Sequence, residues 1–258
     1  MNNSAPVWWF IFHNDRVLLE KKESSFTIPC TCEAPIALNG HTVHELTTLG
    51  NYACKTVKID SPVEENDKFL MVDLRGAYDY LPHPQFNMAG KASEILYWDK
   101  TSTYCPVCGV PTQTFMPIAK KCPQCGYEMF PNISTAILAL VRKGDSILLV
   151  RARNFRGPFH GLVAGFLETG ETLEECVKRE VMEETGLTID HITYFGNQAW
   201  PFPSGLMVGF IADYVSGEIK LQEEELSEGN FYTRDNLPEI PRKLSLARRM
   251  IDWWIEEG

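Results

Sequence analysis

Three glutamates in one short segment could together hold a metal ion. Glu180, Glu183 and Glu184 lie within residues 165–187, GFLETGETLEECVKREVMEETGL. The i, i+3, i+4 spacing places their carboxylates on one side of a helix. Like charges this close repel one another, and oxygen-only ligands suit Mg²⁺ or Mn²⁺, so a bound ion would reverse the repulsion. The segment therefore predicts a divalent-metal site.

The same segment carries the signals of a helix that packs on a sheet. Leu173, Val177 and Val181 follow one another at steps of four and form an apolar side. Gly170 breaks the chain before this helix, and Gly186 is expected to end it with a left-handed cap. We therefore expect the helix to lay its apolar side on a sheet.

Residues 165–187 resemble the Nudix box, G-x5-E-x7-R-E-U-x-E-E-x-G-U. The resemblance holds at Gly165, Glu171, Arg179, Glu180, Val181, Glu183, Glu184, Gly186 and Leu187. A solvated acidic helix is the usual explanation for a run of charges, but it requires neither the glycines nor the arginine at these spacings. The resemblance implies a hydrolase that acts on a nucleoside diphosphate linked to another group.

The composition sets outer limits on the protein class. A length of 258 residues leaves room for one large domain or two small ones. The formal net charge of −10 argues against nucleic-acid binding by a general basic surface, although a specific RNA end could enter one local pocket. No run approaches the roughly 20 apolar residues of a membrane span. Residues 7–12 are interpreted as a strand and not as a signal peptide. We expect no membrane partner.

Four of the eight cysteines have the spacing of a metal site. They form two C-x2-C pairs, each followed by glycine: Cys105, Cys108, Cys122 and Cys125. Four thiolates around one zinc ion leave no open position, so we expect one structural zinc ion per chain. A redox dithiol pair and an iron–sulfur centre are the alternatives. The other cysteines are scattered, which fits a reducing cytoplasm.

Residues 7–22 predict a strand, a polar turn and a second strand, and residues 136–152 predict a comparable unit. This similarity suggests that the N-terminal part is a degenerate relative of the C-terminal fold, but any apolar hairpin would look alike. Residues 1–97 contain no second acidic box. Elsewhere we expect a loop over 82–89, a helix over 92–98, strands over 192–196, 206–214 and 231–232, and a closing helix over 244–255.

Residues 197–205, NQAWPFPSG, alternate prolines with aromatic residues. The segment is therefore stiff and non-helical, and it offers Gln198, Trp200 and Phe202 at fixed positions. Stiff aromatic platforms suit flat heterocycles such as adenine or nicotinamide. The alternative is a proline-rich loop whose aromatic residues plug the core.

The cysteine pairs before the box and the QxWPFP segment behind it resemble the NADH pyrophosphatase family of Nudix hydrolases. The resemblance implies cleavage of NAD(H) to AMP and NMN(H), removal of NAD caps from RNA 5′ ends, and a homodimer. The implied fold is an α/β/α Nudix sandwich with a mixed sheet, preceded by a zinc ribbon and an N-terminal α+β domain of degenerate Nudix type. The corresponding domains are 1–97, 98–130 and 131–258.

The resemblance also assigns site residues. Two or three Mg²⁺ or Mn²⁺ ions would be held by Glu180, Glu184, Glu225 and the carbonyl of Ala164. Glu183 or Glu184 would activate water, and Arg179 would orient the box carboxylates. The substrate contacts would be Arg75, Phe130, Phe166, Gln198, Ala199, Trp200, Pro201, Phe202, Pro203, Ser204, Gly205 and Ala247.

The chain departs from the family's SQPWPFPxS pattern at three positions, where Asn197, Ala199 and Gly205 replace Ser, Pro and Ser. A hydroxyl contact at position 205 is lost unless Ser204 supplies it. By itself, a lone arginine such as Arg75 is more often a surface charge than an anion ligand. Two other functions are compatible with the sequence: a pyrophosphatase that prefers ADP-ribose or another dinucleotide, and a non-catalytic regulator that binds a nucleotide.

Overall fold

The computed structural model describes residues 5–154 and 157–257. The chain folds into two compact units. The first comprises Met1–Asn132 together with Pro201–Ser204, and the second comprises Ile133–Trp200 together with Gly205–Gly258. None of the helices in the described residues combines the length and apolar composition that crossing a membrane requires.

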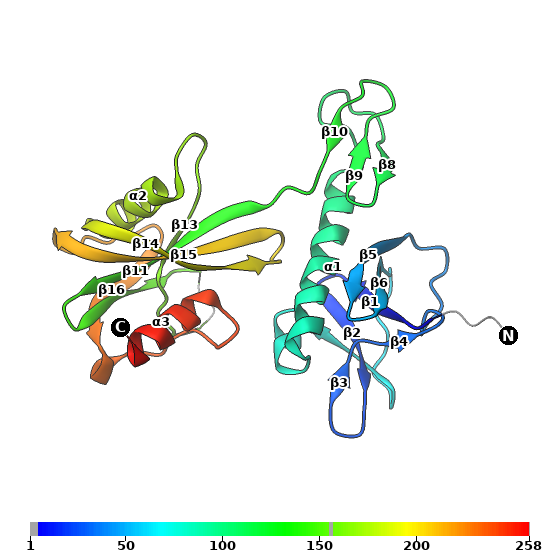
Figure 1. Ribbon diagram of the computed structural model, residues 1–258, viewed down its shortest axis with the longest axis horizontal. Coiled ribbons are helices and arrows are strands. Elements are labelled where there is room, and N and C mark those ends of the chain that lie inside the picture. The colour runs from blue at the N-terminus through cyan, green and yellow to red at the C-terminus, as the bar shows by residue number, and fades with distance from the viewer. Residues whose placement is uncertain (1–4, 155–156, 258) are drawn as a thin grey trace. The chain divides into compact units, whose positions relative to one another are not determined.

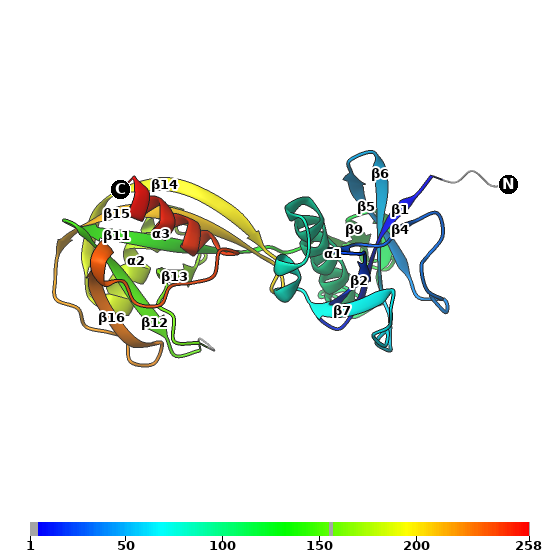
Figure 2. The same cartoon turned by 90° about the horizontal axis from the view of Figure 1, so that it is seen from below.

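The first unit is built on a mixed sheet with the strand order β3-β2-β1-β6-β5, in which β4 also pairs with β1 and β7 with β2. Helix α1, His83–Thr101, packs against this sheet (Figure 2). The strands are β1 Val7–His13, β2 Arg16–Lys21, β3 Phe26–Thr27, β4 Cys30–Thr31, β5 Val43–Leu49, β6 Tyr52–Lys58 and β7 Phe69–Asp73. The 3-10 turn η1, Gly76–Asp79, follows β7.

The loop predicted over 82–89 is wrong, because helix α1 runs from His83 to Thr101. Pro82 precedes the helix and Pro84 lies in its first turn. Proline is tolerated there because the first amides of a helix have no partner within the helix. Phe86 is buried in the same turn region, so this end of the helix joins the core. The expected helix over 92–98 is confirmed as the middle of α1.

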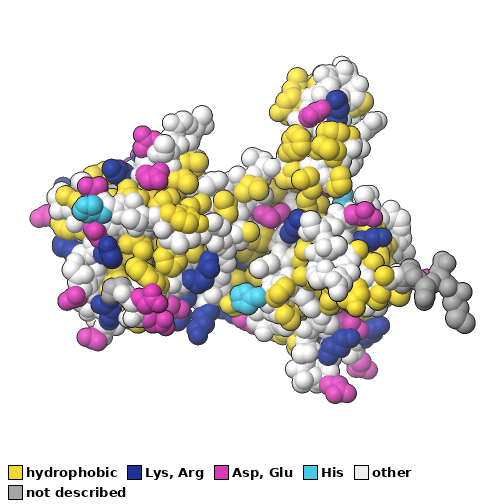
Figure 3. Space-filling model, in the orientation of Figure 1, with side chains coloured by type: hydrophobic (Ala, Val, Ile, Leu, Met, Phe, Trp, Pro, Cys, Tyr) yellow, Lys and Arg dark blue, Asp and Glu magenta, His cyan; other side chains and the backbone are white. Residues whose placement is uncertain are grey.

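The zinc-ribbon segment forms a small three-stranded sheet of β8 Gln113–Met116, β9 Ala119–Lys121 and β10 Glu128–Met129. Lys120 fixes it to the end of α1, because its buried ammonium lies 2.7 Å from the carboxylate of Asp99. Large apolar side chains remain exposed on this segment, which Figure 3 shows as a hydrophobic surface. They are Tyr104, Val107, Phe115, Met116, Ile118, Tyr127 and Phe130.

The second unit is a sandwich in which a mixed sheet lies between two helices (Figure 1). The strand order is β14-β15-β11-β12-β16, with β13 paired to β11. One face of the sheet packs on helix α2, and the other packs on helix α3. The elements are β11 Ser134–Lys143, β12 Ser146–Ala152, β13 Val163–Phe166, α2 Leu173–Thr185, β14 Thr188–Trp200, β15 Gly205–Ser216, β16 Leu226–Thr233, the 3-10 turn η2 Arg234–Asn236 and α3 Leu246–Glu256.

The two units repeat one pairing scheme. In the first, β1 pairs antiparallel with β2 and parallel with β6, while β2 pairs with β7. In the second, β11 pairs antiparallel with β12 and parallel with β15, while β12 pairs with β16. A 3-10 turn and a helix follow in both. The described part of the first unit has no counterpart of α2, so it repeats the scaffold without the acidic helix.

Candidate active site

Helix α2 is capped at both ends by residues of the box segment. The Thr172 hydroxyl accepts a hydrogen bond from the Glu175 amide at 3.3 Å, and the Glu175 carboxylate accepts one from the Thr172 amide at 2.7 Å. This capping box satisfies two amides that the helix itself leaves unpaired. Gly186 ends the helix at a φ of 70°, the left-handed conformation predicted for it. The glutamates between these caps therefore sit on a fixed frame.

Gly165 on β13 allows Glu180 to lie against the strand. A Cβ atom at position 165 would lie 1.8 Å from the carboxylate carbon of Glu180. No side chain other than hydrogen can share that space. The box glycine thus sets how closely the carboxylate approaches the backbone beside Ala164.

Arg179 joins the box carboxylates to one another. Its guanidinium makes a bidentate pair with Glu171, at 3.1 and 2.7 Å, as predicted for a planar donor fork. It also donates to Glu180 at 2.8 Å, to Glu183 at 3.0 Å and to the Phe166 carbonyl at 3.0 Å. The hydrogen bonds from Arg179 hold the pKa of Glu171 at about 2. Arg179 therefore orients two carboxylates of α2 while it is itself anchored to β13.

Glu184 is the most deeply buried of these carboxylates and the least compensated. Its side chain is buried, and its Oε2 has no hydrogen-bond partner among the described residues. Burial, followed by the charges of Glu180 and Glu225, raises its pKa to about 8. Burial also raises the pKa of Glu180, although Arg179 opposes that shift. A divalent cation fits this all-oxygen donor set, because it would offset the repulsion and partner the orphaned oxygen.

The predicted substrate contacts divide between the two units. In the second unit Phe166 is exposed on β13, whereas Ala247 is buried on the core side of α3. Gln198 fixes the start of α3, since its amide donates to the Leu244 carbonyl at 2.9 Å and accepts from the Leu246 amide at 2.6 Å. Among the described contacts, Gln198 is thus engaged with the helix backbone.

The departure at Gly205 has a local structural reason. A Cβ atom there would lie 3.2 Å from the Ser134 carbonyl oxygen and 3.3 Å from the Trp200 carbonyl oxygen. This is tighter than an ordinary contact, so a serine would require the backbone to move. The neighbouring Ser204 hydroxyl donates to the Asn132 carbonyl at 2.9 Å. Ala199 and Trp200 complete the end of β14, and Trp200 pairs with Gly205.

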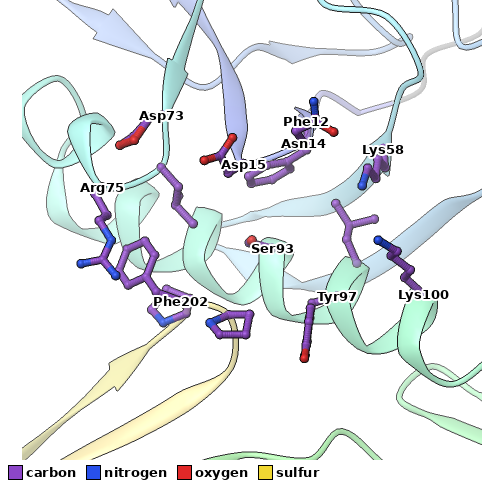
Figure 4. Close-up of a pocket in the computed structure, with 14 residues that line it drawn as sticks. Phe12, Asn14, Asp15, Lys58, Asp73, Arg75, Ser93, Tyr97, Lys100 and Phe202 are labelled. Carbon is purple, nitrogen blue, oxygen red and sulfur yellow. The ribbon is translucent and has the colours of Figure 1, made fainter. Parts of the chain in front are cut away.

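The remaining predicted contacts lie in the first unit. The guanidinium carbon of Arg75 lies 4.1 Å from the centre of the Phe202 ring. Pro201, Phe202 and Pro203 line a cavity of about 380 Å³ with α1, as Figure 4 shows for Arg75 and Phe202. Phe130 is more than half exposed.

The four cysteine sulfurs converge as the spacing predicted. All lie within 4.8 Å of one another, and Cys105–Cys125 and Cys108–Cys122 are 3.6 and 3.4 Å apart. A tetrahedral zinc site with bonds of about 2.3 Å requires sulfur separations of roughly 3.8 Å. The Val107 amide donates to the Cys105 sulfur at 3.4 Å. A hydrogen bond from the Cys125 amide lowers the pKa of Cys122 to about 6, which favours the thiolate that binds metal.

Two structural residues escaped the sequence analysis. Cys176 was classed with the scattered cysteines, yet its thiol lies 3.5 Å from both the Phe166 carbonyl and the Arg179 guanidinium. Its burial raises the pKa to about 12, so the thiol is inert. Gly90 is buried in α1 with Pro201 as its neighbour. A glycine in a helix interior was the available signal, but the partner lies far away in sequence.

Comparison with known proteins agrees with the architecture and the box. Residues 131–254 match the NUDIX domain, and residues 6–98 match the NADH pyrophosphatase-like rudimentary NUDIX domain. A crystal structure of a NUDIX hydrolase from Nitrosomonas europaea superposes with a TM-score of 0.51 at 20% identity, over 60% of this chain and 92% of that chain. The fold and the site therefore define a Nudix hydrolase. The N-terminal part is its degenerate relative, which decides the question that the sequence left open.

Closer relatives specify the family. A protein of Haemophilus influenzae strain Rd named NAD-capped RNA hydrolase NudC is 36% identical over 254 residues, which cover 96% of this chain and 93% of that protein. A protein of the same name from Pseudomonas aeruginosa is 41% identical over 183 residues. That match covers 70% of this chain and 64% of the relative, somewhat less than two thirds of its length. This chain belongs to the NADH pyrophosphatase family of Nudix hydrolases.

Proposed function

We propose that the protein hydrolyses the pyrophosphate bond of NAD(H) to NMN(H) and AMP and removes NAD caps from RNA 5′ ends. The observation that carries the hydrolytic part is the carboxylate of Glu184, which is buried beside Glu180 and whose Oε2 has no hydrogen-bond partner among the described residues. Such an arrangement is costly unless a cation and a polyphosphate use it. The choice of NAD rests on the relatives, which are named NAD-capped RNA hydrolases.

Glu180, Glu184, Glu225 and the carbonyl of Ala164 would hold two or three Mg²⁺ or Mn²⁺ ions. When bound, these ions would neutralise the pyrophosphate oxygens and lower the pKa of a water molecule. Arg179 keeps Glu180 and Glu183 in place by hydrogen bonds of 2.8 and 3.0 Å. Glu183 is half-exposed on the same helix, so either it or Glu184 would take the proton of the attacking water.

The sequence-based assignments of substrate contacts, apart from those at Arg75, Pro201 and Phe202, form part of the proposal. Phe166, with its exposed ring, and Trp200 are the strongest candidates for stacking on a nicotinamide or adenine ring. Phe130, Gln198, Ala199, Pro203, Ser204, Gly205 and Ala247 remain predicted contacts.

Cys105, Cys108, Cys122 and Cys125 would bind one structural zinc ion. The sulfur separations and the amide hydrogen bonds to sulfur support this choice. Reduced thiols are required for it, which supports a cytoplasmic location. The exposed apolar side chains of the ribbon support a homodimer. The proposed domain limits are 1–97, 98–130 and 131–258.

The deciding experiment is product analysis after incubation with Mg²⁺ or Mn²⁺ and either NADH or ADP-ribose. Faster formation of NMNH and AMP from NADH is the expected result, and NAD-capped RNA would be tested next. A preference for ADP-ribose would replace the proposed substrate. If neither compound is cleaved while NAD still binds, the protein is a nucleotide-binding regulator and the proposal fails.

A further inference from the structure

Gly90 occupies a position in α1 where a glycine is unexpected. It is buried within a helix of 19 residues, and glycine is the weakest helix former apart from proline. A Cβ atom at this position would lie 2.9 Å from Cγ of Pro201 and 3.5 Å from its Cβ. Its three nearest neighbours all belong to Pro201. The missing side chain thus makes room for one residue from the other half of the sequence.

Two further contacts hold the neighbours of Pro201. The Arg75 guanidinium lies over the face of Phe202 at 4.1 Å, a cation–π arrangement visible in Figure 4. The Ser204 hydroxyl donates to the Asn132 carbonyl at 2.9 Å. Residues 201–204 are therefore held by the residue before η1, by α1 and by the segment after the ribbon, all of them parts of the first unit.

The same four residues are the tip of a hairpin whose arms belong to the second unit. β14 ends at Trp200 and β15 begins at Gly205, and these two residues pair directly. Two residues before Trp200, Gln198 is fixed to the start of α3. The position of Trp200 is thus constrained on one side by Gln198 and on the other by the seating of Pro201 and Phe202.

We propose that the first unit is a socket for the Pro201–Ser204 tip, and that Pro201 and Phe202 are positioning residues for Trp200 and not substrate contacts. The socket consists of Arg75, Gly90 and Asn132. It gives the rudimentary domain, which has no acidic box, a role in the site. The effect on catalysis rests on the proposed function, whereas the seating of the tip does not.

A double-mutant cycle of Gly90→Ala and Pro201→Ala tests the seating without any substrate. Pro201→Ala removes the atom that lies 2.9 Å from the added methyl group. In that background, Gly90→Ala should raise the melting temperature by roughly 2–4 °C, because alanine is the better helix former. In the wild-type background the same change should lower it, and hydrogen exchange at Phe202 and Ser204 should become faster. An equal rise in both backgrounds would overturn the proposal.

Steady-state kinetics with NADH test the positioning role. Gly90→Ala and Pro201→Ala should each raise KM. The KM of the double variant should not exceed the higher of the two single-variant values, because both changes act through the same contact between Gly90 and Pro201. If Pro201→Ala raises KM while Gly90→Ala leaves it unchanged, Pro201 contacts substrate directly and the positioning role is refuted. If the wild type does not cleave NADH, the proposed function fails, and the melting-temperature cycle still decides the seating.

Discussion

Replacing Glu184 by glutamine should raise the free energy of unfolding of the metal-free protein. The same change should leave the protein almost inactive when Mg²⁺ or Mn²⁺ is present. The Glu184 carboxyl has a folded-state pKa of about 8, raised first by burial, against an ordinary value of 4.5. Because this carboxyl pKa is raised in the folded state, the stability that the protonated Glu184 contributes is fully present below pH 4.5 and is lost as the pH rises towards 8. At pH 7 linkage puts this loss at about 3 kcal/mol. Glutamine carries no charge at any pH, so the variant does not suffer this loss of stability.

Urea unfolding in buffer free of Mg²⁺ and Mn²⁺ measures this difference. Between pH 5 and 7 the stability advantage of Glu184→Gln over wild type should grow by up to about 1.4 kcal/mol per pH unit. Adding Mg²⁺ should then stabilise wild type more than the variant, because the ion loses a charged ligand. kcat should fall by several orders of magnitude, since the proposed metal ligand is lost.

Glu183→Gln is the matched control for stability. Glu183 lies on the same helix, but its side chain is 54% exposed. Its replacement should change the free energy of unfolding by no more than about 0.5 kcal/mol. The reasoning is refuted if Glu184→Gln is no more stable than wild type at pH 7, or if its advantage does not depend on pH.

Three further changes test other parts of the structure. Gly165→Ala places a Cβ atom where the Glu180 carboxylate now lies, so kcat should fall by about 100-fold; Gly196→Ala, with nothing within 4 Å, should leave it unchanged, and equal effects would contradict this explanation. Cys122→Ser should abolish zinc binding, measured by elemental analysis, whereas Cys32→Ser should retain it; a full zinc content in Cys122→Ser would exclude the four-cysteine site. Gln198→Ala should lower the free energy of unfolding by about 1–3 kcal/mol, because the α3 amide and carbonyl lose their partner. Urea unfolding checks this, with the exposed Asn197→Ala as the near-neutral reference.

The box could be predicted in detail because its determinants are local. The carboxylates on α2 are separated by one helical turn, and the capping residues lie next to the helix they terminate. The four clustered cysteines are likewise paired by short loops, with a glycine of positive φ after each pair. Where one short stretch of sequence contains all the residues of a site, their spacing is sufficient to predict the site.

The elements around the box were predicted less completely. The strand expected over 192–196 extends to Trp200, and the strand expected over 206–214 already begins at Gly205. Both are longer than expected because the pairing between β14 and β15 continues past the apolar core of each strand. The loop expected over 82–89 proved to be the start of α1, since prolines that interrupt a helix are also compatible with its first turn. Both errors arose where one residue pattern suits two structures.

The sequence by itself determined the Nudix box, the four-cysteine site and the family, since each depends on residue types at short, fixed spacings. Only the tertiary structure decided how deeply Glu184 is buried, that Gly165 makes room for Glu180, and that Pro201 rests on Gly90. Burial and close approach depend on which distant segments pack together. The pattern of residues along the sequence does not reveal that Gly90 in α1 contacts Pro201, which lies more than a hundred positions later in the chain.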